Sequence, residues 1–270
     1  MATVAAIQMT TGPDVAANLV NARHWLEEAA RGGALVAALP ENFAFMGLKN
    51  ADKQAVAEPD GAGPIQDFLR ETARQLGMWV IGGTVPVRSE ADGRVSAASL
   101  VFDSHGEQRA RYDKIHLFDV RVSDHEAHRE SATVAPGRRP VVIDTPAGKL
   151  GLAVCYDVRF PEVFRQLSAA GAEWFCLPSA FTMPTGRAHW ETLLKARAIE
   201  NLCFMVAPAQ SGVHASGRET YGDTMIVDYW GRILARRPRG QGVVSATFDF
   251  TRQAETRRNF PVLEHRVFAS

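Results

Sequence analysis

The stretch GLAVCYDVRFPE, residues 151–162, passes from a predicted strand into a predicted helix. Leu150 to Val154 is a short apolar run typical of a buried strand, and Pro161 suits the first turn of a helix. Cys155 lies between them, where backbone N–H groups and a helix N-terminus would favour a thiolate or a developing oxyanion. A lone cysteine in an apolar strand is also typical of a packed core. This stretch by itself therefore leaves the role of Cys155 open.

Strands alternate with helices over the rest of the chain, and hairpins follow. We expect helices over residues 15–31, 61–76, 161–170 and 188–201, and strands over 3–9, 34–39, 78–85, 94–103, 107–112, 141–145, 149–154, 174–177, 203–209, 224–228, 233–235 and 243–250. Residues 115–137 are predicted to form a long loop with at most one helical turn. The tail from Thr251 is charged and is expected to wrap another surface. This alternation predicts a layered α/β fold, and no composition break divides residues 1–270 into two domains.

The composition is that of a chain able to bury a full hydrophobic core. Of its 270 residues, 46% are hydrophobic and 22% are charged. Thirty basic and thirty acidic residues cancel, so no global charge favours nucleic acid or an anionic membrane. Three cysteines without a CxxC pair fit a reducing compartment. Neither a secretory signal pattern nor an apolar run approaching roughly 20 residues is found, so we expect a cytoplasmic protein.

Three chemically useful side chains follow predicted strands. Glu41 comes after the strand at 34–39, Lys114 after the strand at 107–112, and Cys155 ends the strand described above. Loops at strand ends commonly build the sites of α/β proteins. A glutamate beside a cysteine can take the thiol proton, and a lysine can stabilise a tetrahedral oxyanion. Each residue alone also has an ordinary explanation as a solvated loop residue or a surface ion pair, and their spacing does not show that they meet.

The sequence resembles the nitrilase, or carbon–nitrogen hydrolase, superfamily. Three motifs carry the resemblance in the family's order: Leu-Pro-Glu at 39–41, Tyr-Asp-Lys-Ile-His-Leu-Phe-Asp at 112–119, and the stretch at 151–162. The similarity continues through residues 178–181, 188–190 and 197–200. It implies a four-layer α-β-β-α sandwich with two mixed sheets, formed by the whole chain as one domain.

The resemblance also implies a catalytic triad, carried here by Glu41, Lys114 and Cys155. A second glutamate is expected near the triad, and the matching segment assigns this role to Glu130. Its surroundings are more polar than the family pattern, so Glu126 is kept as an alternative. Whether the second glutamate positions the lysine or handles a proton stays open.

Within the superfamily, the chain is most similar to the deaminated-glutathione amidase branch. The segments that carry this likeness are 114–120, 221–225 and 257–266. The branch implies an amidase that hydrolyses a small carboxylate-bearing amide through a cysteine thioester and releases ammonia. An omega-amidase acting on 2-oxoglutaramate-type acids and an N-carbamoyl amino acid hydrolase are the alternative enzymes. A non-catalytic scaffold of the same fold is the alternative of another class.

A substrate that carries carboxylates should be met by cations. Arg187, His214 and Arg218 are expected on loops as substrate-binding residues, and Lys49 is a further candidate. The backbone N–H at Tyr156 is expected to contribute to the oxyanion site. No metal or organic cofactor is predicted. The partners expected are the amide substrate, water and, from the resemblance, a second copy of the chain in a homodimer or larger homo-oligomer.

Overall fold

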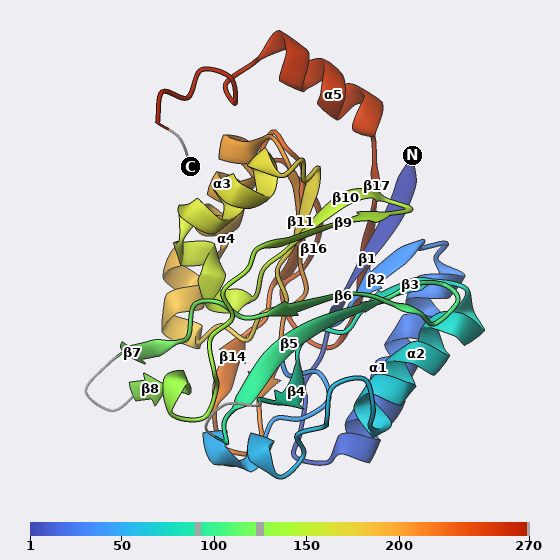
Figure 1. The fold of residues 1–270 in the computed structure, drawn as a ribbon, viewed down its shortest axis with the longest axis vertical. Helices are drawn as coiled ribbons and strands as arrows, with labels where there is room; N and C mark the ends of the chain where they lie inside the picture. The colour runs from blue at the N-terminus through green and yellow to red at the C-terminus, as the bar shows by residue number, and fades with distance from the viewer. Residues whose placement is uncertain (90–92, 123–126, 269–270) are drawn as a thin grey trace.

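The computed structural model describes residues 1–89, 93–122 and 127–268, which form four layers (Figure 1). Helices α1 (Val15–Arg31) and α2 (Pro64–Leu76) cover the outer face of one sheet. Helices α3 (Pro161–Ala169) and α4 (Met183–Asn201) cover the outer face of the other. The predicted α-β-β-α sandwich with two mixed sheets is therefore confirmed.

The first sheet has the order β17-β1-β2-β3-β5-β4, with β6 also paired to β5. Its strands are β1 (Ala2–Gln8), β2 (Val36–Ala38), β3 (Trp79–Ile81), β4 (Val85–Arg88), β5 (Val95–Phe102), β6 (Gln108–Asp113) and β17 (Gly242–Phe248). Alternate residues of β1 enter different cores, because successive side chains of a strand point to opposite faces. Val4 and Ala6 join the core between the sheets, whereas Ala5 and Ile7 pack with α1 and α2.

The second sheet has the order β16-β15-β12-β11-β10-β9. Its strands are β9 (Val141–Thr145), β10 (Gly148–Leu152), β11 (Trp174–Cys176), β12 (Phe204–Ala207), β15 (Thr224–Val227) and β16 (Ile233–Arg237). Aromatic side chains join the two sheets. Phe248 of the first sheet stacks on Phe204 of the second, with 4.1 Å between ring centroids, and meets Trp174 edge-on, with 5.9 Å between ring centroids. Both sheets therefore share one core, which holds their strand ends together.

Several elements differ from the sequence predictions. Residues 115–137 are not a plain loop, since they include the hairpin β7 (Asp119–Arg121) and β8 (Ala127–Arg129) and the 3₁₀ turn η2 (Glu130–Ala132). The tail contains helix α5 (Phe250–Asn259), whose charged sequence buries only Gln253 and so lacks an apolar period. Helix α4 begins five residues earlier than expected. Shorter elements are η1 (Asn50–Gln54), η3 (Cys155–Arg159), β13 (Ser211–Val213) and β14 (Glu219–Tyr221).

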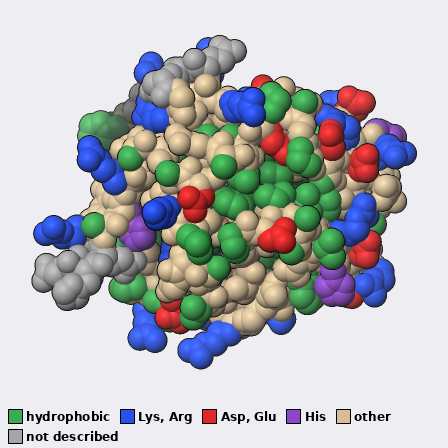
Figure 2. Space-filling view, turned by 90° about the horizontal axis from the view of Figure 1, so that it is seen from below, with side chains coloured by type: hydrophobic (Ala, Val, Ile, Leu, Met, Phe, Trp, Pro, Cys, Tyr) green, Lys and Arg blue, Asp and Glu red, His purple; other side chains and the backbone are tan. Residues whose placement is uncertain are grey.

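The surface carries charges of both signs. Figure 2 shows one face, on which basic side chains lie mostly toward the edge, whereas acidic side chains lie both at the edge and beside the apolar side chains that gather toward the middle. This mixture agrees with the balanced formal charge of the sequence. Among the described residues, no helix is both long enough and apolar enough to cross a lipid bilayer.

Candidate active site

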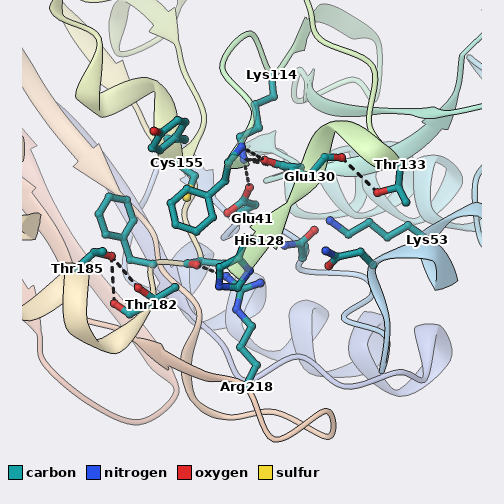
Figure 3. Close-up of a pocket in the computed structure, with 16 residues that line it drawn as sticks. Glu41, Lys53, Lys114, His128, Glu130, Thr133, Cys155, Thr182, Thr185 and Arg218 are labelled. Carbon is teal, nitrogen blue, oxygen red and sulfur yellow. Dashed lines mark hydrogen bonds and ion pairs between the residues drawn. The ribbon is translucent and has the colours of Figure 1, made fainter. Parts of the chain in front are cut away.

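Cys155 lies at a sharp turn where β10 leads into η3 (Figure 3). Its φ of +46° is in the left-handed region, which costs a non-glycine residue about 1–3 kcal/mol. The N–H of Cys155 donates to the carbonyl of Pro178 at 3.0 Å, which holds the turn against the end of β11. The thiol is buried but lines a cavity, and Tyr156 follows with one of the first amides of η3, which have no acceptor within the turn.

Asp157 joins the cysteine turn to the second motif. Its Oδ2 accepts hydrogen bonds from the hydroxyl of Tyr112 at 2.7 Å and the N–H of Val154 at 2.8 Å. Its Oδ1 lies 3.0 Å from the N–H of His116 and 2.8 Å from the Nδ1 of the same residue. Asp157 is fully buried, so these contacts replace its hydration. The lysine between residues 112 and 116 is thereby brought beside the thiol.

Lys114 is the charged centre of the site. Its Nζ lies 2.9 Å from Glu41 Oε1 and 2.8 Å from Glu130 Oε2, and all three side chains converge in Figure 3. Burial opposes its charge, but the carboxylates of Glu130 and Glu41 hold the pKa of Lys114 well above its ordinary value. The side chain is therefore an ammonium throughout the neutral pH range.

Glu130, expected as the second glutamate, reaches the triad from η2. Both of its oxygens lie within 3.0 Å of the lysine Nζ, and Oε2 also accepts from the N–H of Phe118 at 2.7 Å. Burial opposes its charge, but Lys114 and Lys53 hold the pKa of Glu130 below its usual range. Glu130 is thus a carboxylate that anchors the lysine. The alternative, Glu126, lies outside the described residues.

The thiol of Cys155 is protonated at rest. Burial, and then the negative charge of Glu41, raise its pKa, while Lys114 and the backbone of Ala180 act in the opposite direction. The side chains of Glu41 and Cys155 line the same cavity. A nucleophilic attack would therefore require proton transfer as it proceeds, and Glu41 is placed to accept that proton.

Two cavities meet at the site. The inner one has a volume of about 40 Å³ and the outer one about 600 Å³. The inner cavity is lined by Glu41, Asn42, Asn50, Lys53, Lys114, Phe118, His128, Glu130, Thr133, Cys155, Tyr156, Ala180, Phe181, Thr182, Thr185 and Arg218. The inner volume is small, so a substrate that reaches the thiol must extend into the outer cavity, whose volume is in the range of small-molecule sites. Within the described ranges, no three His, Cys, Asp or Glu side chains are grouped to hold a metal ion.

The expected substrate-binding residues fall into two groups. Tyr156 and Arg218 line the inner cavity, and Lys49 lines the outer one. Arg187 is exposed on α4 and lines neither cavity. His214 also lies outside both cavities.

The ring of His214 serves the fold. It is buried, its Nδ1 lies 2.9 Å from the carbonyl oxygen of Thr11, and its Nε2 lies 2.7 Å from Thr220 Oγ1. Burial lowers the pKa of this imidazole, so it is neutral at pH 7. Both ring nitrogens are occupied, which leaves none to meet a carboxylate.

Lys53 was missed by sequence reasoning, although it lines both cavities. It lies in η1, a short element with no apolar period that could have indicated its direction. Asp157 was quoted within its motif but was not assigned a role, because nothing in the sequence shows what a buried carboxylate accepts.

The comparisons with known proteins agree with this geometry. The family model described as carbon–nitrogen hydrolase matches residues 3–258. A protein from Yersinia enterocolitica named deaminated glutathione amidase is 44% identical over 271 residues, covering 100% of this chain and 94% of its own length. The crystal structure of the C. elegans NitFhit protein matches with a TM-score of 0.91 at 36% identity, over 99% of this chain and 66% of the NitFhit chain.

Saccharomyces cerevisiae Nit3, described as a member of branch 10 of the nitrilase superfamily, has a TM-score of 0.89 at 28% identity. The match covers 99% of this chain and 97% of the Nit3 chain. Family model, relative and structures all span nearly the full length, and the three motifs meet at one cavity. This chain belongs to the carbon–nitrogen hydrolase family of the nitrilase superfamily.

Proposed function

We propose that the protein is an amidase in which Cys155 is the nucleophile, Glu41 the general base and Lys114 the electrostatic stabiliser. The observation that carries the proposal is the buried ammonium of Lys114, held between the carboxylates of Glu41 and Glu130 beside the thiol. Such a preformed arrangement stabilises charge that develops in a transition state without reorganisation.

In the first half-reaction, Cys155 attacks the amide carbonyl as its proton passes to Glu41. The carbonyl oxygen gains negative charge, which the Lys114 ammonium and the N–H of Tyr156 stabilise. The C–N bond then breaks, Glu41 returns the proton to the leaving nitrogen, and an acyl thioester remains. In the second half-reaction, Glu41 takes a proton from water and the hydroxide adds to the thioester carbonyl. The C–S bond then breaks, the carboxylic acid leaves, and Glu41 returns the proton to the sulfur to restore the thiol.

We propose deaminated glutathione as the substrate. The name of the Yersinia enterocolitica relative, at 44% identity over the whole chain, supports this assignment, and so do the cations that line the cavities. A primary amide would release ammonia, whereas the linear amide of deaminated glutathione would release the cysteinylglycine amine. An assay should therefore follow the dicarboxylic product as well as ammonia.

The experiment compares Cys155→Ala with Cys176→Ala on deaminated glutathione. We expect no turnover in the first variant and retained turnover in the second, because Cys176 is a core residue of β11. In wild type, intact mass under single-turnover conditions should show the acyl group on Cys155. Turnover by a folded Cys155→Ala variant would refute the mechanism, and equal inactivity of wild type on every amide would favour a scaffold.

A panel of substrates separates the enzyme alternatives. Steady-state rates on deaminated glutathione, 2-oxoglutaramate and N-carbamoyl amino acids should favour the first if the proposed substrate is right. A preference for either of the others would reassign the branch while keeping the chemistry.

We further propose that residues 1–270 act as one domain, that the protein works in the cytoplasm, and that it forms at least a homodimer. The shared core supports the first point, and three free cysteines support a reducing compartment. Exposed Val267 and Phe268 support an interface between copies.

A further inference from the structure

The inner and outer cavities form one continuous path to the thiol. They share five lining residues, which are Asn42, Asn50, Lys53, His128 and Arg218. A substrate that places its amide at Cys155 must therefore pass these side chains or remain in contact with them. Two of the five, Lys53 and Arg218, are a lysine and an arginine.

Lys53 and Arg218 reach this path from separate parts of the chain. Lys53 lies in η1, and Arg218 lies in the connection between β13 and β14. In Figure 3, the side chain of Lys53 enters from the right and that of Arg218 from below. The outer cavity is further lined by Lys49 and by one carboxylate, Glu219, so cations outnumber anions along it.

Neither side chain forms an ion pair with a described residue, although the charges of Glu130 and Glu41 act on Lys53. Lys53 makes no hydrogen bond or ion pair within the described part of the chain, in contrast to Lys114, which has two carboxylates. Arg218 donates from Nη2 to the carbonyl of Ala180 at 2.6 Å, but its Nε is buried without a hydrogen-bond partner. Buried donors of this kind are costly to leave unpaired.

The electrostatics of Lys53 agree with an unfilled requirement for an anion. Burial lowers its pKa, the carboxylates of Glu130 and Glu41 offset this only in part, and the positive charges of Lys114 and Arg218 lower it further. A carboxylate placed between Lys53 and Arg218 would satisfy both groups with charge-assisted hydrogen bonds.

Resting on the function proposed above, we propose that Lys53 and Arg218 form a subsite for the free carboxylate at the far end of the substrate's acyl chain. Both residues line the inner cavity that also holds the thiol, so they can contact a group that stays attached through the thioester stage. The leaving group departs after the first half-reaction, and Lys49, which lies only in the outer cavity, is better placed to meet it. The subsite therefore selects monoamides of short dicarboxylic acids.

The test uses two amides of equal chain length. Glutaric acid monoamide carries the far carboxylate, and pentanamide carries a methyl group in its place. We expect the ratio of their kcat/KM values to fall roughly 10- to 100-fold in Lys53→Met and in Arg218→Met, as expected for the loss of one charge-assisted hydrogen bond. Lys53→Arg should restore part of the ratio, because it retains a cation.

Matched controls come from cations outside both cavities. Lys149 is exposed on β10 and Arg187 is exposed on α4, so Lys149→Met and Arg187→Met should leave the ratio within about twofold of wild type. A binding measurement avoids turnover altogether: calorimetry of glutarate with Cys155→Ala should show roughly 10-fold weaker affinity when Lys53→Met is added.

The outcomes separate the two levels of inference. An unchanged ratio of kcat/KM values in both variants would overturn the subsite. An equal loss of kcat/KM on both amides would overturn it too, since the residues would then serve the chemistry or the fold. Retained glutarate affinity in the double variant would overturn it as well. Wild type that hydrolyses no amide at all, yet binds glutarate through Lys53, would overturn the proposed function and leave the carboxylate subsite standing.

Discussion

Asp157→Asn tests whether one buried carboxylate holds the two halves of the site together. Asp157 presents Oδ2 to Tyr112 and Val154, and Oδ1 to the backbone and ring of His116. The substitution keeps the size of the side chain but replaces one acceptor oxygen with an NH₂ donor. Two of the partners, the tyrosine hydroxyl and the imidazole ring of His116, can turn or change tautomer to accept a hydrogen bond. The two backbone N–H groups cannot.

The size of the expected stability loss follows from this difference between side-chain and backbone partners. In one orientation the new NH₂ faces the N–H of Val154, and in the other it faces the N–H of His116, so one buried backbone donor is unpaired in either case. An unpaired buried donor costs about 1–3 kcal/mol. Loss of charge assistance at the remaining bonds adds about 1 kcal/mol. We therefore expect the free energy of unfolding to fall by about 2–4 kcal/mol, a large share of the 5–15 kcal/mol typical of a domain.

Equilibrium urea unfolding measures this loss, with Asp144→Asn as the matched control. Asp144 forms an exposed ion pair with Lys149 on β9 and β10, and its loss should cost less than about 1 kcal/mol. A Tyr112→Phe variant should cost less than Asp157→Asn, because it removes one donor and leaves none unpaired. A loss below about 0.5 kcal/mol in Asp157→Asn would refute the reasoning.

The same variant should impair catalysis. Lys114 lies midway between residues 112 and 116, both of which are anchored on Asp157, so a shift of these anchors moves the ammonium relative to the thiol. A displacement near 1 Å can cost roughly 100-fold in rate. We expect kcat/KM of folded Asp157→Asn to fall at least about 10-fold, and an unchanged value would show that the anchors do not position the lysine.

Three further predictions concern the charges around the thiol. Glu41→Gln should abolish turnover yet lower the pKa of Cys155, because the charge of Glu41 raises that pKa. The pH profile of iodoacetamide labelling of Cys155, followed by mass, should then move to lower pH, and an unmoved profile would contradict the role assigned to Glu41. Lys114→Met should raise the pKa of the thiol, slow labelling, and destabilise the fold by about 3–5 kcal/mol in urea, because two buried carboxylates lose their partner. Because the pKa of Glu130 is lower in the folded state, its carboxylate stabilises the fold above the unfolded pKa of about 4.3, and this contribution is lost as pH falls through the folded pKa. In acid titrations, the difference in the free energy of unfolding between wild type and Glu130→Gln should therefore narrow below about pH 4.

The fold was predictable where pattern and burial coincide. Helix α1 matches its predicted span because apolar residues recur on one face between Asp14 and Gly32, which cap its ends. Helix α5 was missed because its single buried residue, Gln253, is polar and anchors through the carbonyls of Glu173 and Leu202. Tertiary hydrogen bonds of this kind leave no periodic signal in a sequence.

The site was predictable only to the level of residue types in motifs. The motifs named Glu41, Lys114, Cys155 and Glu130, and the structure places these four around one cavity. The choice among loop cations failed for a physical reason. Whether an arginine or a lysine lines a cavity depends on its rotamer and on the loop that carries it, and neither is set by local spacing.

The charges of the site explain why the lysine is placed between two glutamates. Because the pKa of Lys114 is held well above its ordinary value, this side chain cannot serve as a proton donor at neutral pH. Proton transfer must then pass through Glu41, which lines the same cavity as the thiol and whose charge acts on it. When the thiol proton moves to Glu41 and the sulfur attacks, the total charge of the site is unchanged. One negative charge moves from Glu41 to the oxyanion beside the same ammonium, while Glu130 keeps that ammonium in place. Glu130 therefore holds Lys114 in place while Glu41 is protonated. A lysine free to move at that stage would no longer stabilise the oxyanion.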